Sequence, residues 1–235
     1  MKRLNGRILV RLIASMSALS LVLGVTACAE RNPKLGVIDA GGLMRGEVEE
    51  MSLHEQFDLF GERQARIEQL LTEAQLQVSS ESWTWSGQML IPSSGQTALN
   101  QLPGATAENS YYLSMARYIH IPGATGGRED IEPIIDYFES QGWEVSLNEV
   151  STDHLIARAD TGDGYMLEYW VQASGQYNMI ARSYLFWGDY RGLLYAIADR
   201  VPDEELGVSE SVPGVFTQFP EWSDPVIEDD PYADL

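Results

Sequence analysis

Residues 143–187 read WEVSLNEVSTDHLIARADTGDGYMLEYWVQASGQYNMIARSYLFW, and this stretch decides the fold. It contains four strand-like segments, at 143–150, 154–160, 165–173 and 177–187. The connections between them are short and turn-like, at 151–153, 161–164 and 174–175. Connections this short join antiparallel strands, because a parallel pair needs a crossover of about a dozen residues or more. We therefore predict successive antiparallel hairpins.

Helical periodicity lies on both sides of this stretch. A long helix is predicted to begin at Ser52, whose spacing from Glu55 is that of a capping box. Its apolar residues recur at three- and four-residue steps, at Phe57, Phe60, Ile67, Leu70, Leu71, Ala74 and Val78. Two further helices are predicted, over 129–140 and from Asp189 to just before Pro202, and a fifth strand is predicted over 111–120.

Together these elements predict an α+β fold, with one mainly antiparallel, four- to five-stranded sheet and helices packed on one face. The predicted domain covers residues 52–201. Residues 28–51 contain several glycines and no sustained period, so they are predicted to be a flexible tether. Residues 202–235 are acidic and contain prolines, and this tail is predicted to be largely disordered. Its aromatic residues Phe216, Phe219 and Trp222 can pin its middle to the domain.

The first 27 residues have the three parts of a secretory signal. Cations at positions 2, 3, 7 and 11 precede an apolar run over 12–24, and small residues follow it. The run is shorter than the roughly 20 residues of a membrane-spanning helix. Val25-Thr26-Ala27-Cys28 resembles the lipobox of bacterial lipoproteins. That resemblance implies a diacylglyceryl group on the Cys28 sulfur and signal cleavage between Ala27 and Cys28.

Lipidation also gives a use to the only cysteine of the chain, which has no partner for an internal disulfide. Two acyl chains, such as palmitate, anchor a protein stably, whereas one chain binds only marginally. We therefore predict a protein anchored by Cys28 to the cell membrane, on its extracytoplasmic face. The formal charge of −20 becomes −20 − 4 = −24 when the four cations of residues 1–27 are removed. Such a balance excludes nucleic acid as a partner on electrostatic grounds.

The order of these features is similar to that of the LppA-like lipoproteins of actinobacteria. The shared features are a lipobox, a tether, a long helix, a tryptophan-containing loop, and then a helix and hairpins with a Gly-Asp-Gly turn. The likeness covers about 54–85 and 128–187. The family has a cysteine pair in its mature domain, which this chain lacks. The resemblance implies an envelope lipoprotein and no particular activity.

Several kinds of reactive site lack the residues they need. Acylation of Cys28 excludes thiol catalysis and zinc–thiolate sites. Lys34 is the only lysine after the signal segment, so a Schiff-base or Ser–Lys site has no lysine in the folded domain. The three histidines do not have metal-ligand spacing. Residues 160–164, DTGDG, lack the acidic alternation of a calcium loop and predict a tight turn. We predict no catalytic residue, no metal and no cofactor.

The candidate contact residues for a ligand or partner are Trp83 and Trp85, which lie in a polar loop. Both indoles share one side if the backbone is extended. If exposed, they can stack on a sugar ring or anchor a protein partner. Alternatively, they cap the sheet core. Glu168 with Arg158 and Arg182 can form a charge ladder on neighbouring strands, which we interpret as structural.

The sequence therefore predicts a membrane-anchored lipoprotein that is a non-catalytic binding or accessory module of the cell envelope, with an envelope protein or a saccharide as its ligand. Two alternatives stay open: a small carboxylate-dependent cell-wall hydrolase, and a structural or assembly partner of an envelope protein complex. A cleft with two carboxylates, one of raised pKa, would favour the hydrolase. A large exposed apolar patch around the two tryptophans would favour a protein partner.

Overall fold

The computed structural model describes residues 36–86, 90–98, 101–202 and 209–227 of the chain. The predicted signal segment, with its cleavage site between Ala27 and Cys28, lies outside the described residues. The helices are α1 (Arg45–Glu49), α2 (Leu53–Leu76), α3 (Arg128–Ser140) and α4 (Tyr190–Ala198), with a short 3-10 helix, η1 (Gly95–Thr97). None of these described helices combines the length and the apolarity that a bilayer crossing requires.

The main sheet has seven strands in the order β10-β1-β4-β8-β7-β6-β5, and its pairs are antiparallel. Its strands are β1 (Trp83–Trp85), β4 (Ser114–His120), β5 (Glu144–Ser151), β6 (His154–Asp160), β7 (Tyr165–Gln172), β8 (Gln176–Ser183) and β10 (Glu210–Ser211). A second sheet contains β2 (Ser93–Ser94), β3 (Ser110–Tyr112) and β9 (Phe186–Trp187). The predicted α+β class and the hairpins are confirmed.

The strand count is a correction, since the sequence predicted four or five strands. The additional strands β1 and β10 have three and two residues, too few to show an alternating pattern. The predicted strand over 111–120 is also divided: β3 and β4 belong to different sheets and are separated at Leu113. In the same way, the predicted strand 177–187 is divided into β8 and β9.

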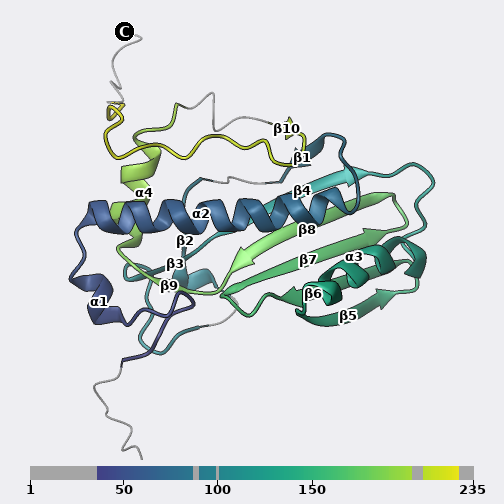
Figure 1. Cartoon of the computed structure of the whole chain (residues 1–235), viewed down its shortest axis with the longest axis horizontal. Helices are drawn as coiled ribbons and strands as arrows, with labels where there is room; N and C mark the ends of the chain where they lie inside the picture. Colours follow the sequence, from purple (N-terminus) through teal and green to yellow (C-terminus); the bar gives the residue numbers. More distant parts are fainter. Residues whose placement is uncertain (1–35, 87–89, 99–100, 203–208, 228–235) are drawn as a thin grey trace, which may run out of the picture. The chain divides into compact units, whose positions relative to one another are not determined.

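The helices pack on one face of the main sheet, with α2 along β7 and β8 and α3 over β5 to β7 (Figure 1). The predicted capping box starts α2: the Glu55 N–H donates to Ser52 Oγ at 3.2 Å, and the Ser52 N–H donates to Glu55 Oε2 at 2.7 Å. The predicted apolar stripe of α2 is buried except for Val78, which is half-buried. It meets alternate residues of β6 to β8 in one core.

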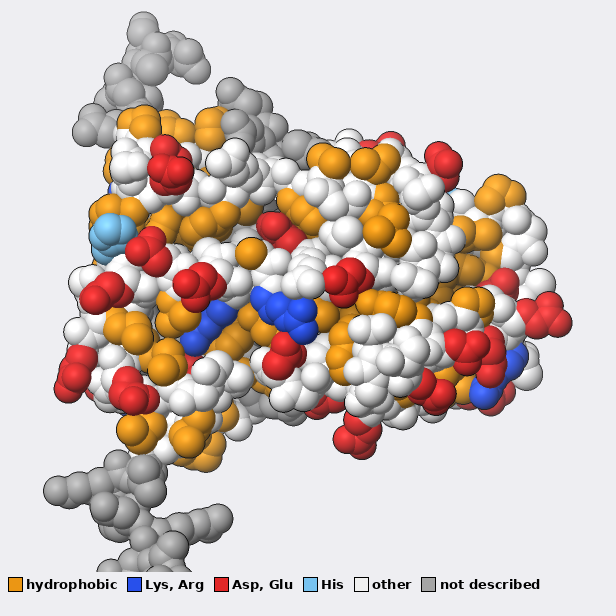
Figure 2. Space-filling model, viewed as in Figure 1, with side chains coloured by type: hydrophobic (Ala, Val, Ile, Leu, Met, Phe, Trp, Pro, Cys, Tyr) orange, Lys and Arg blue, Asp and Glu red, His pale blue; other side chains and the backbone are white. Residues whose placement is uncertain are grey.

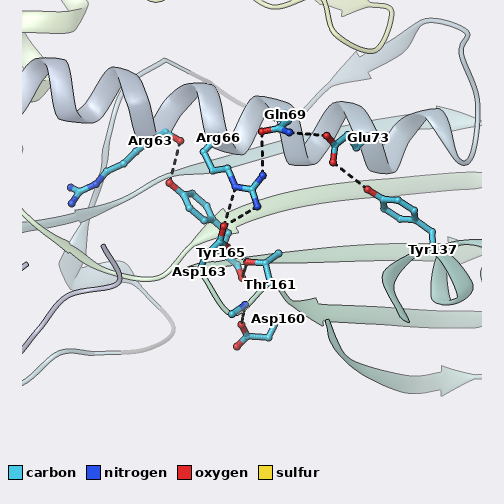
Figure 3. Close-up of polar contacts among 10 residues, drawn as sticks. Arg63, Arg66, Gln69, Glu73, Tyr137, Asp160, Thr161, Asp163 and Tyr165 are labelled. Atoms are coloured by element: carbon cyan, nitrogen blue, oxygen red, sulfur yellow. Dashed lines mark hydrogen bonds and ion pairs between the residues drawn. The ribbon is translucent and has the colours of Figure 1, made fainter. Parts of the chain in front are cut away.

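Side chains also tie α2 to the β6–β7 turn (Figure 3). Arg66 donates to Asp163 Oδ2 through Nε at 3.0 Å and Nη2 at 2.8 Å, while Thr161 donates to Asp163 Oδ1. Asp160 Oδ1 accepts the Gly162 N–H at 2.9 Å. These carboxylate oxygens therefore serve the turn and the helix, and the prediction of a tight turn at 160–164 is confirmed.

The tether prediction for 28–51 is wrong for its described part. The Trp187 indole N–H donates to the Val37 carbonyl at 2.9 Å, and α1 buries Val48. The buried Asp39 carboxylate accepts the Trp187 backbone N–H at 3.0 Å and lies 3.6 Å from the Arg63 guanidinium. Single side chains and a backbone hydrogen bond, from the Ala40 N–H to the Leu185 carbonyl at 3.0 Å, hold this segment, so no periodic pattern in the sequence predicts its docking.

The tail prediction for 202–235 is likewise wrong for residues 209–227, although the pinning by aromatic residues is confirmed. The ring centroid of Phe219 lies 5.0 Å from that of Phe57 in α2, and Phe216 lies 5.7 Å from Trp85. Trp222 stacks on His54 at 4.8 Å. This segment runs along α2 and contributes β10 to the sheet edge (Figure 1). Figure 2 shows the helix-bearing face, with acidic side chains scattered over it and few basic ones.

Candidate functional site

The structure places both predicted contact tryptophans in the core. Trp83 is 0% exposed and Trp85 is 9% exposed. Their indole N–H groups donate to the Ser79 carbonyl at 3.1 Å and to Ser211 Oγ at 3.2 Å. Both rings lie on one side of β1, as predicted, but β1 is enclosed between β4 and β10 and that side faces the core. Ligand contact requires exposed indoles, so this burial contradicts the contact prediction and supports the core-capping alternative.

The opposite face of the sheet has no described α-helix against it, and we call it the helix-free face. Alternation along the strands directs the even-numbered residues of β4 to β8 to this face. Its central side chains are Ser114, Ala116, Tyr118, Ile156, Arg158, Met166, Glu168, Trp170, Asn178, Ile180 and Arg182. Most of them are partly exposed, while Ile156, Glu168 and Ile180 are buried. The face thus combines aromatic and apolar side chains with arginine, glutamate and amide groups.

A buried glutamate holds an indole in place at the centre of this face. Glu168 is 3% exposed and has one donor for each carboxylate oxygen. Arg158 Nε donates to Oε1 at 3.0 Å, and the Trp170 indole N–H donates to Oε2 at 3.0 Å. Because a buried carboxylate without donors is costly, this arrangement fixes the rotamers of both neighbours. The partly exposed Trp170 ring is therefore a pre-oriented surface.

Polar donors without partners lie beside that ring. Arg158 donates a hydrogen bond from Nε to Glu168, and its two terminal nitrogens have no partner among the described residues. Its side chain is 42% exposed, so solvent can reach it. Asn178, directly opposite Trp170 in the register, accepts a hydrogen bond from Gln176 at 3.3 Å through Oδ1. Its amide N–H groups have no acceptor among the described residues. The cross-strand row continues to Ile156 on one side and Tyr118 on the other.

A cavity of about 160 Å³ opens at one end of the helix-free face. Its lining residues are Thr97, Ala98, Tyr112, Ser114, Met166, Arg182, Ser183 and Tyr184. Arg182 is paired in register with Met166 and Ser114, not with Glu168. The predicted charge ladder is therefore confirmed for Arg158 and Glu168 and wrong for Arg182, since the guanidinium of Arg182 has no hydrogen bond or ion pair among the described residues.

Comparison with protein-family models, curated proteins and solved structures finds no match. The resemblance to bacterial lipoproteins and the predicted anchor at Cys28 therefore stay predictions from the sequence.

Among the described residues, no cavity brings together a pair of carboxylates of which one has a raised pKa. Burial raises the pKa of Glu68 to about 6, against the opposing hydrogen bond from Gln64, but Glu68 lines none of the described cavities. A second cavity, of about 290 Å³, has Glu49, Glu108 and Asp189 among its lining residues. Glu49 is paired with an arginine of its own helix, and Asp189 caps α4. This cavity therefore lacks the distinct general acid and general base that a carboxylate-dependent hydrolase requires.

Metal ligands are not grouped in the described part of the chain: no set of three His, Cys, Asp or Glu residues there could hold an ion. His54 lies in α2 and stacks on Trp222. His120 ends β4, and His154 starts β6. These are the three positions that the sequence indicated, and they do not form one site.

The sequence pattern led us to assign the binding role to Trp83 and Trp85, and Trp170 was not among the candidates. One signal in the sequence indicated that Trp83 and Trp85 are buried. The tryptophans at 83 and 85 are separated by one residue, which is the spacing of a strand with one buried side.

Proposed function

We propose that the chain is a lipid-anchored, non-catalytic binding module of the cell envelope and that it binds a saccharide on its helix-free face. The observation that carries this proposal is the Trp170 ring, which is partly exposed and oriented by Glu168. A flat, pre-oriented indole offers an apolar platform for the C–H face of a sugar ring, at a low cost in conformational entropy. The free N–H donors of Arg158 and Asn178 can donate hydrogen bonds to sugar hydroxyl oxygens.

The anchoring half of the proposal comes from the sequence pattern that ends in Cys28. With Cys28 lipidated, the chain has nine residue steps (37 − 28) before Val37, which hydrogen-bonds to the domain. Nine steps span at most about 30 Å when fully extended. The binding face would then stay within the extracytoplasmic layer next to the membrane, on the side where cell-wall saccharides occur.

A Cys28→Ala substitution tests the anchor. We expect the variant to be released to the medium or to accumulate as an unprocessed precursor, because it cannot receive the diacylglyceryl group. Membrane fractionation and intact-mass measurement separate these outcomes from the wild-type behaviour. Normal maturation and unchanged membrane retention of the variant would contradict the anchor.

A Trp170→Ala substitution tests the binding face, with calorimetric titration of a panel of neutral and acidic cell-wall oligosaccharides. We expect affinity to fall at least tenfold, since the stacking platform is removed. Trp222→Ala is the matched control, because Trp222 is a partly buried indole that packs on α2 instead. Equal affinity in wild type and Trp170→Ala, with both proteins folded by circular dichroism, would refute saccharide stacking at this residue.

A further inference from the structure

We propose that the cavity around Arg182 is a binding site for a small carboxylate that carries a hydroxyl or amino group on the neighbouring carbon. The inference goes beyond saccharide stacking and depends on the cavity alone. Its lining includes an arginine without partners among the described residues, two tyrosines and two serines, around one hollow of about 160 Å³.

The unpaired guanidinium is the first part of the argument. Arg182 lies on β8 between Ser114 of β4 and Met166 of β7, so no carboxylate is opposite it in the sheet. It has no hydrogen bond, ion pair or ring contact among the described residues. Arginine presents donors in a planar fork that matches a carboxylate with two parallel hydrogen bonds. Arg182 is therefore a free anion receptor on the wall of a cavity.

The hydrogen-bond directions of the two tyrosines give the second part. Tyr184 Oη donates its hydrogen to Asp160 Oδ2 at 2.6 Å. Burial, together with this hydrogen bond, raises the pKa of Tyr184 to about 12, so the phenol keeps its proton at neutral pH. With its hydrogen directed at Asp160, the Tyr184 oxygen can only accept from a ligand.

The Tyr112 oxygen can likewise only accept from a ligand, because its hydrogen is directed at Thr97. The Thr97 hydroxyl donates to the Ser94 carbonyl at 2.9 Å, so in its 3.3 Å contact with Tyr112 Oη the tyrosine is the donor. The Tyr112 oxygen then has lone pairs for a ligand and no hydrogen to offer. The cavity consequently combines one cationic donor with two neutral acceptors, and a matching ligand has an anionic group next to a hydroxyl or ammonium group.

The size of the cavity and the charge of its lining indicate which anions it can bind. A hollow of about 160 Å³ has room for an α-hydroxy or α-amino carboxylate, either free or at the end of a larger molecule. A phosphate dianion fits less well, because Arg182 is the only basic residue among the described residues that line the cavity, and Asp160 lies behind Tyr184.

The cavity and the Trp170 platform are separate parts of one face. Trp170 is paired with Asn178, and Asn178 precedes Arg182 by four residues on β8. At about 3.3 Å per residue, the two positions are on the order of 13 Å apart along the strand. A substitution at one position therefore need not disturb the other, and their losses can be measured independently.

The experiment is a calorimetric titration of the full-length, detergent-purified protein with lactate, alanine, methyl lactate and inorganic phosphate. We expect saturable binding of lactate or alanine, and at least tenfold weaker binding of the neutral methyl ester. Arg182→Gln should abolish the binding, and Arg182→Lys, which keeps the charge but loses the fork, should weaken it. Arg191→Gln is the matched control, because Arg191 is exposed on α4, has no partner among the described residues and lines none of the described cavities.

Three outcomes would overturn the proposal: no saturable binding of lactate or alanine to the wild-type protein, equal binding of methyl lactate, or tighter binding of phosphate than of either carboxylate. Full retention of lactate binding by folded Arg182→Gln would also overturn it. Trp170→Ala separates this inference from the proposed function. That variant is expected to keep lactate binding while losing oligosaccharide binding, so either idea can fail without the other.

Discussion

Glu68 offers a quantitative test of the packing between α2 and its surroundings. Its carboxylate is partly buried on α2, and desolvation raises its pKa from 4.5 to about 6, despite the hydrogen bond from Gln64. A carboxyl group with a raised pKa in the folded state binds its proton more tightly there than in the unfolded chain. The folded state is therefore favoured at low pH, and this contribution is lost as the pH rises from about 4.5 to 6.

The size of the effect follows from the shift. A change from 4.5 to about 6 corresponds to about 2 kcal/mol of unfolding free energy, at 1.36 kcal/mol per unit. Since the side chain keeps some contact with solvent, we expect about 1–2 kcal/mol. Glu68→Gln removes the ionised form, keeps the shape and can still accept from Gln64. The substitution should therefore stabilise the protein by about 1–2 kcal/mol at pH 8 and by less than about 0.5 kcal/mol at pH 4.5.

Urea unfolding followed by tryptophan fluorescence, at pH 4.5 and pH 8, measures both values. Glu62→Gln is the control, because Glu62 is an exposed carboxylate of the same helix without a partner among the described residues. It should change stability by less than about 0.5 kcal/mol at either pH. The reasoning is refuted if Glu68→Gln gives the same stabilisation at both pH values, or none at pH 8.

Three further substitutions test the core and the docked N-terminal segment. Trp83→Ala should lower the unfolding free energy by about 3–5 kcal/mol in urea titrations, because a fully buried indole is removed; unchanged stability would restore an exposed role for this residue. Gly164→Ala should cost about 1–3 kcal/mol in the same assay, since the residue has φ +96° and a Cβ there would lie 2.6 Å from the Ala40 carbonyl oxygen. Asp39→Asn should cost about 3–5 kcal/mol and speed backbone hydrogen exchange near residue 39, because it leaves the buried Arg63 without its anion.

Regular elements could be predicted because their signals are local and repeated. The four apolar residues on one side of α3, Ile131, Ile134, Ile135 and Phe138, are all buried as their spacing indicates. Pro133 lies in the second turn of this helix, on its exposed side, where water can reach the carbonyl that lost its N–H donor.

The short strands, the docked N-terminal segment and the candidate site depend on contacts between segments that are distant in the sequence. The pairing of Trp83 with Ser211 in β1 and β10 joins positions more than a hundred residues apart, and neither strand has enough residues to show a period. The Asp39–Arg63 pair docks a segment whose own sequence resembles a loop. Polar side chains at sheet positions gave no clue to which face would receive a helix, so the candidate site could be located only once the topology was known.

The distribution of arginine partners distinguishes the two faces of the sheet. On the helix-bearing face, Arg63 and Arg66 are each paired with a carboxylate that is also engaged by the chain around it. On the helix-free face, Arg158 gives one nitrogen to Glu168 and Arg182 gives none. A shortage of acids does not explain this difference, since the chain has 35 acidic and 15 basic residues. Arg158 and Arg182 thus keep free donors on the face where aromatic rings and a cavity are accessible to a ligand, whereas buried Arg117 on the helix-bearing side donates to Gln75 and Ser211 instead of a carboxylate.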